Sequence, residues 1–339
     1  PPPPPPPPSP PPPPPSSPPP SPTSPNPPAP TTPATVDNDV VATTTLAARL
    51  STQVRLVNRA VLYLFMYPLH LEQHLRALRD FLLMGAGDFA HSLSTLLFER
   101  LEEVTRPRPT DLELGLILDA AFAVHAPNET ADPPPLSLAW AETDGDARSG
   151  WSPYVPGAFD NLCLGYTVPP PLDIVVDPPA LASYQAVHVL FLRIQRCSAV
   201  LTDLWSVLQA PRLRNVRNTS VHALHLRKLQ RVRAQMQHFV SIMQGYLASQ
   251  VLDAAWTDFT SALRARVGCL DSLRAEHAAF LAAVHAKCLL TPAARSVMNV
   301  IDGMLATILK FYELIVSQTA LDSLTHANMA RFESVADSF

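Results

Sequence analysis

Apolar side chains recur at steps of three and four residues along most of this chain, which is the spacing of one face of a helix. The pattern is clearest over residues 69–101, where two such stretches meet at Gly85–Phe89. Gly87 is suited to end the first helix, and Asp88 is suited to cap the free N–H groups of the second. The pattern therefore predicts two helices joined by a tight corner.

The same spacing predicts helices in six further stretches. These are residues 42–67, 110–124, 181–208, 220–256, 270–290 and 292–321. In the second stretch Thr110 is the expected N-cap. The residues expected to face the core there are Leu112, Leu116 and Ala120. We also expect the aromatic residues on the apolar stripes to be core residues, namely Phe89, Tyr184, Trp205, Phe239 and Trp256.

One segment favours β structure instead of helix. Between Leu162 and Val168 apolar side chains alternate with smaller or polar ones, until a run of prolines interrupts the alternation. We predict a short irregular hairpin within residues 159–176, formed by residues 162–168 and 172–176, as the only β element. Residues 126–158 are rich in Pro, Asp, Gly and Asn, and we expect a loop there.

The chain opens with a run of proline, serine and threonine, a composition that forms neither regular helix nor sheet. We predict a disordered linker over residues 1–40, with a ligand for an SH3 or WW domain as the alternative. Residues 41–339 are then expected to form a helical domain. Its predicted parts are sub-bundles at about 41–125 and 178–339, with the loop and hairpin at 126–177.

Composition supports a helical class. After the proline-rich start, leucine and alanine dominate and glycine is scarce, so we predict an all-α fold of stacked, elongated helical bundles with one short β-hairpin-like insertion. The four cysteines lack C-x-x-C spacing, which favours buried thiols in a reducing compartment. Because the sequence also lacks a run of about 18 apolar residues, we expect a cytoplasmic protein without membrane insertion.

No stretch has the spacing that catalysis requires, so we predict a protein that is not an enzyme and needs no cofactor or metal. Gly85–Ala90 satisfies G-x-G-x-x-A as a string, but a helical pattern precedes it, where dinucleotide binding requires a strand. His70 and His74 are four residues apart, as in some zinc sites. The glutamate between them stands third of five, where metalloproteases have it second or fourth.

Basic residues cluster between two of the predicted helices and along the start of the second. They are Arg212, Arg214, Arg217, Arg227, Lys228, Arg231 and Arg233. The chain has a net charge of -4, and no aromatic residues interleave with the cluster for base stacking. An acidic protein partner is therefore favoured over a nucleic acid, and a solvated helix face is the remaining alternative.

Five sequence blocks carry a family resemblance. They are LRDFLLMGAGDFAHSL, FDNLCLGYTVPPPLDIVV, a long helix centred on Tyr184 that ends at Leu204-Trp205, MQHFVSIMQGYLASQVLDAAWTDF, and EHAAFLAAVHAKCLL. In this order, over residues 46–321, they resemble the C-terminal half of the gamma-tubulin complex components. The resemblance implies an all-helical, non-enzymatic subunit that binds one gamma-tubulin molecule and positions it to template microtubule nucleation.

The same resemblance implies contacts with other gamma-tubulin complex components through an N-terminal half that is not in this chain. It also implies a location in the cytoplasm and cytoskeleton, at the centrosome or another microtubule-organising centre and at the spindle pole. We predict that gamma-tubulin binds an exposed hairpin and the start of the basic cluster. The residues are Leu164, Tyr166, Val168, Leu172, Arg212, Arg214 and Arg217. The alternative is a helical-rod subunit of a vesicle-tethering complex.

Overall fold

The computed structural model describes residues 38–102, 108–125, 135–141, 157–209, 220–319, 334–335 and 339. The chain divides into two compact units, Pro1–Gln53 and Val54–Phe339. In the first unit the described residues belong to helix α1 (Asn38–Met66), which continues into the second. The predicted linker lies outside the described residues up to residue 37, and residues 38–40 are helical.

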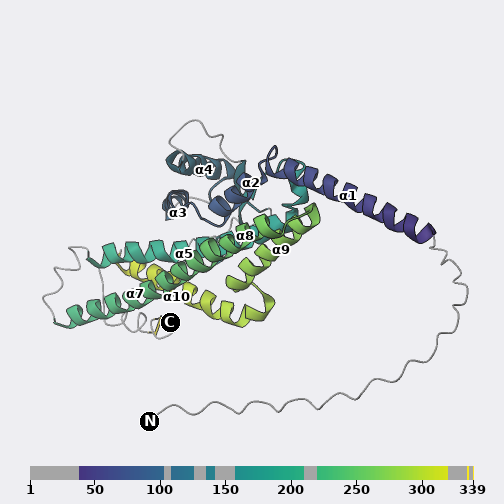
Figure 1. Ribbon diagram of the computed structural model, residues 1–339. Coiled ribbons are helices and arrows are strands. Elements are labelled where there is room, and N and C mark those ends of the chain that lie inside the picture. Colours follow the sequence, from purple (N-terminus) through teal and green to yellow (C-terminus); the bar gives the residue numbers. More distant parts are fainter. Residues whose placement is uncertain are drawn as a thin grey trace, which may run out of the picture. The chain divides into compact units, whose positions relative to one another are not determined.

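In the second unit the predicted helices are all present, so the predominantly helical class with one small β element is confirmed (Figure 1). The helices that follow α1 are α2 (Leu71–Ala77), α3 (Gly87–Glu102), α4 (Asp111–His125), α5 (Pro178–Gln209), α7 (Ser220–Leu247), α8 (Trp256–Arg266), α9 (Leu270–Lys287) and α10 (Arg295–Thr319). Short 3₁₀ turns are η2 (Leu172–Ile174) and η5 (Pro292–Ala294).

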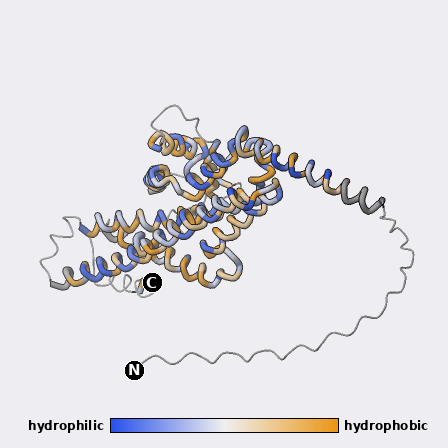
Figure 2. The backbone as a smooth tube through the Cα atoms, in the orientation of Figure 1, coloured by the Kyte–Doolittle hydropathy of each residue, from blue (hydrophilic) through white to orange (hydrophobic). Residues whose placement is uncertain are grey.

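Helix α5 is the central element of this unit. It packs against α3, α7, α9 and α10, while α3 and α4 pack against each other (Figure 1). Most of the apolar stripe predicted for α5 is buried, including Tyr184, Phe191 and Leu204. Hydrophobic and hydrophilic residues alternate around the helices, as amphipathic packing requires (Figure 2). The expectation for Trp205 is wrong: its side chain is 44% exposed, and the guanidinium of Arg233 lies 4.7 Å from its ring centroid.

Buried polar side chains connect α5 to its neighbours. The imidazole of His188 is fully buried, and its Nδ1 donates a hydrogen bond to the carbonyl of Leu82 at 2.9 Å. His277 of α9 donates from Nδ1 to the carbonyl of Val175 at 3.2 Å, so its Nε2 accepts from the Tyr184 hydroxyl at 3.1 Å. These bonds fix both neutral tautomers and cross-link α5 to the segment that contains Leu82 and to α9.

Two helical stretches contain a π-helical segment where the sequence pattern indicated ordinary helix. The first, η1 (Leu78–Leu82), follows α2 directly, and the second, η4 (Ala248–Ala255), joins α7 to α8. The predicted helix over 220–256 therefore continues to Arg266. At the corner after η1 the left-handed residue is Met84, with φ of 55°, whereas Gly87 and Asp88 belong to the first turn of α3. The predicted capping roles of Gly87 and Asp88 are wrong.

In the described part of the chain, no single helix is both long and apolar enough to cross a membrane. The segments Leu71–Leu82 and Gly87–Arg100, which are bent by 42° relative to each other, meet the requirement only when they are counted together.

Candidate partner-binding surface

The hairpin has a different partner strand from the one predicted. Strand β1 (Leu136–Trp140), in the predicted loop, pairs antiparallel with β2 (Leu162–Tyr166), and Leu138 faces Leu164. Residues 172–176 supply the turn η2 instead of a strand. A Cβ atom at position 165 would lie 2.6 Å from Ser137 Oγ, so a larger residue there would require the Ser137 side chain to move.

The sequence analysis expected one face of β2 to be exposed, but that face is buried. Leu164, Tyr166 and Leu172 all lie in the core, and Val168 is partly buried against it. The Tyr166 hydroxyl and His74 Nδ1 are hydrogen-bonded at 2.6 Å, and burial raises the pKa of Tyr166 to about 12. These side chains therefore anchor the hairpin to the core, and the expectation that they form an exposed surface is wrong.

A glutamine on α5 attaches β2 to the central helix. The Leu164 N–H donates to Gln185 Oε1 at 3.0 Å, and Gln185 Nε2 donates to the carbonyl of Leu162 at 2.6 Å. The side-chain amide thus takes the place of a further strand along this edge of β2.

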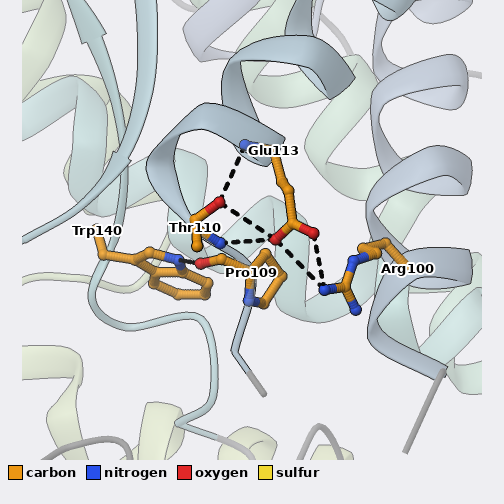
Figure 3. Close-up of polar contacts among 5 residues, drawn as sticks. All are labelled: Arg100, Pro109, Thr110, Glu113 and Trp140. Carbon is orange, nitrogen blue, oxygen red and sulfur yellow. Dashed lines mark hydrogen bonds and ion pairs between the residues drawn. The ribbon is translucent and has the colours of Figure 1, made fainter. Parts of the chain in front are cut away.

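The start of α4 is a rigid corner formed by a capping box (Figure 3). The Glu113 N–H donates to Thr110 Oγ1 at 3.3 Å, and the Thr110 N–H donates to Glu113 Oε2 at 2.8 Å. This backbone bond and the ion pair with Arg100, at 3.0 Å, lower the pKa of the Glu113 carboxyl. Trp140 Nε1 donates to the carbonyl of Pro109 at 2.9 Å, which joins β1 to the same corner. The predicted cap at Thr110 is confirmed.

Helix α4 presents the opposite face from the one predicted. Leu114, Leu118 and Ala121 are buried, whereas Leu112 and Leu116 are 78% and 63% exposed. Val124 is also exposed at the far end of the helix. These exposed apolar residues, Leu112, Leu116 and Val124, are called the α4 stripe below. An apolar stripe on a rigid helix is a typical protein-binding feature.

The basic cluster is only partly within the described residues. Arg212, Arg214 and Arg217 lie outside them. On α7 the side chains of Arg227 and Arg231 are exposed. Arg233 is half-buried, and its Nη1 donates to the carbonyl of Leu201 at 3.2 Å.

The described residues include no group of three His, Cys, Asp or Glu side chains placed to share a metal ion. The Gly85–Ala90 string lies at the corner between η1 and α3, with a helical segment before it, as the sequence pattern indicated. Its context is therefore not that of a dinucleotide-binding turn.

Comparison with known proteins decides the family. A family model described as gamma tubulin complex component C-terminal matches residues 71–339, most of the chain. The chain belongs to the gamma-tubulin complex component family. Within the family the chain resembles component 6, since the human gamma-tubulin complex component 6 is 35% identical to it over 275 residues. That match covers 80% of this chain and 15% of the human protein.

More distant relatives align over a similar share of this chain. A gamma-tubulin complex component 3 homolog of Xenopus laevis is 28% identical over 274 residues, which is 78% of this chain and 27% of the homolog. The spindle pole body component alp6 of Schizosaccharomyces pombe is 23% identical over 259 residues, covering 75% of this chain and 30% of alp6. The chain thus corresponds to a minor part of each of these relatives.

Proposed function

We propose that this chain binds gamma-tubulin and positions it to template microtubule nucleation, without catalysing a reaction. The observation that carries the proposal is the family match over residues 71–339. The proposed setting is the cytoplasm and cytoskeleton, at a microtubule-organising centre such as the centrosome or the spindle pole. Binding to other complex components through a segment outside this chain stays a prediction.

The α4 stripe is the contact surface that we propose in place of the hairpin. Three features support it: the side chains are apolar and exposed, the capping box fixes the start of the helix, and Trp140 joins the adjacent strand to it. A contact on such a preorganised element requires little ordering on binding. The vesicle-tethering alternative has no comparable support, since the family match is to gamma-tubulin complex components.

We expect the double substitution Leu112→Glu and Leu116→Glu to weaken gamma-tubulin binding roughly 100-fold, because two carboxylates would be desolvated at an apolar contact. Size-exclusion chromatography with light scattering on an equimolar mixture with purified gamma-tubulin measures complex formation. The matched control is Val300→Glu, since Val300 is an exposed apolar residue on α10. A complex that survives in the double variant would reject the α4 stripe. If the unaltered chain fails to bind gamma-tubulin, the proposed function itself is wrong.

The basic cluster gives a second, independent prediction. Changing Arg212, Arg214 and Arg217 together to glutamate should weaken gamma-tubulin binding roughly tenfold, mainly through slower association, because charges at a contact rim act on the encounter rate. Surface plasmon resonance at two salt concentrations measures the association rate, and circular dichroism checks folding. An unchanged rate in a folded variant would remove these arginines from the contact.

Val168 is the remaining member of the predicted hairpin set, and its contribution to gamma-tubulin binding stays a prediction.

A further inference from the structure

A pocket of about 210 Å³ lies where the corner after η1 meets α5 and the junction of α7 with η4. Its apolar lining includes Met84, Phe191 and Leu252, together with Ala248, which is exposed. Met84 and Phe191 are buried, so the inner wall belongs to the core. This pocket is separate from the α4 stripe and from the hairpin.

Unusual backbone forms two of its walls. The π-helical segment η1 directly precedes the lining residue Leu83, and η4 contributes Ala248 and Leu252. Met84, between η1 and α3, has a φ of 55°, a left-handed conformation that residues with a side chain rarely adopt. π-Helical segments and residues in strained backbone conformations are both frequent at functional sites.

Two side-chain amides form the polar part of the pocket. Gln244 Nε2 donates to Gln195 Oε1 at 3.3 Å. Within the described part of the chain this is the one hydrogen bond of either side-chain amide. The Gln195 NH₂ group therefore keeps donors, and Gln244 Oε1 keeps its acceptor positions. A donor and an acceptor side by side complement an amide group in a ligand.

The size of the pocket fits one apolar group. A dry cavity of about 150 Å³ is large enough to bind benzene. The volume here is larger, so an aromatic ring or a branched aliphatic side chain fits it. We propose that this pocket binds one anchor residue of a peptide, with an aromatic or branched aliphatic side chain against the apolar wall and its backbone amide on Gln195 and Gln244. The proposal does not depend on gamma-tubulin binding.

The probe for the experiment is N-acetyl-phenylalaninamide, which has one aromatic ring and two amides. The expected dissociation constant is on the order of 1 mM, since a ligand of this size gains roughly 0.3 kcal/mol per non-hydrogen atom. The methyl resonance of Met84 in protein labelled at methionine methyl groups reports binding, and Met84→Leu assigns it. We expect this resonance to shift and to saturate during the titration.

Two variants and one control separate the apolar part of the proposal from the amide part. Ala248→Phe fills the pocket and should abolish saturable binding, whereas Ser249→Phe, at the neighbouring exposed position of η4, should leave it unchanged. Gln195→Leu should weaken the amide probe about tenfold and leave toluene binding unchanged. Circular dichroism checks each variant, and Gln195→Leu carries the test if Ala248→Phe does not fold.

Three results would overturn the proposal. The first is an unshifted Met84 resonance at about 10 mM probe, roughly tenfold above the expected dissociation constant. The second is equal loss of binding in Ser249→Phe. The third is equal affinity for toluene and the amide probe together with no effect of Gln195→Leu, which would leave an apolar cavity without amide recognition.

Discussion

Phe89→Ala is expected to lower the free energy of unfolding by about 3–5 kcal/mol, as is typical when a fully buried aromatic ring is removed. Phe89 is inaccessible to solvent, and its ring centroid lies 4.9 Å from those of both Phe81 and Phe122. One side chain therefore connects η1, α3 and α4. Its loss would leave a cavity beneath the corner that three elements share, and those elements would collapse into it only in part.

Urea unfolding followed by circular dichroism measures this change. Phe89→Leu is the graded comparison and should cost about 1 kcal/mol, since much of the apolar volume is retained. Tyr63→Ala is the surface control, because Tyr63 is exposed on α1 and its loss should change stability by less than about 0.5 kcal/mol. A cost below 1 kcal/mol for Phe89→Ala would mean that the corner repacks freely, contrary to the close ring contacts.

We expect stability to fall as the pH drops from about 6.5 towards 4, with His188 as a principal cause. Burial lowers the pKa of His188 from 6.5 to about 4, so the folded protein keeps this imidazole neutral while the unfolded chain binds a proton. In that window the unfolded state carries more protons, and stability therefore rises with pH. The full effect of His188 is about 3 kcal/mol. Burial lowers the pKa of His277 as well, which acts in the same direction.

The protonated imidazole of His188 would also have a second N–H group without a hydrogen-bond acceptor among the described residues. Nδ1 already donates to the Leu82 carbonyl, and Nε2 is buried without a hydrogen-bond partner among the described residues. Urea midpoints at pH 7 and pH 5 should show that His188→Gln removes about 2 kcal/mol of the pH dependence. His238→Gln, an exposed position on α7, is the control. Identical pH dependence in the His188 variant and the unaltered chain would assign the acid sensitivity to other groups.

The helices could be predicted because each long one buries a single stripe, but α4 shows where the pattern is insufficient. Its sequence, DLELGLILDAAFAVH, is apolar on more than one face, so two stripes compete for the core. Leu114, Leu118 and Ala121 face inward because Glu113 caps the helix and pairs with Arg100 on α3, which fixes the rotation of the helix. The contact between α3 and α4 therefore determines which face of α4 is buried. The spacing of apolar residues within α4 alone does not show this.

The hairpin was predicted with the wrong partner for a similar reason. The five residues of β1 alternate, with Leu136 and Leu138 on one face, but they follow a proline-rich stretch and are too short to stand out. Pairing with β2 across a long connection is a property of the folded chain. The predicted contact residues Leu164, Tyr166 and Leu172 were chosen as exposed, but all three are buried. The hydrogen bonds from Tyr166 to His74 of α2 and from Leu164 to Gln185 of α5 place β2 against both helices.

The buried polar residues were not found from the sequence. His188, His277 and Arg196 are buried polar residues on amphipathic helices, and nothing in their sequence spacing marks them as buried. Their partners come from distant elements: Leu82 for His188, Val175 and Tyr184 for His277, and the ring of Phe98 for the Arg196 guanidinium. Because each pair joins residues far apart in the sequence, the burial of these polar side chains becomes visible only in the folded structure.

The π-helical segment η4 also bears on how the helical stretch from α7 to α8 changes during evolution. From Ser220 to Arg266 the chain is helical without a break, and a residue inserted into an ordinary helix would rotate everything beyond it by about 100°. A π turn holds one residue more than an α turn, so deletion of one residue within Ala248–Ala255 would convert it to α-helix while the buried faces of α7 and α8 stay in place. Related chains that differ in length by one residue are expected to differ here.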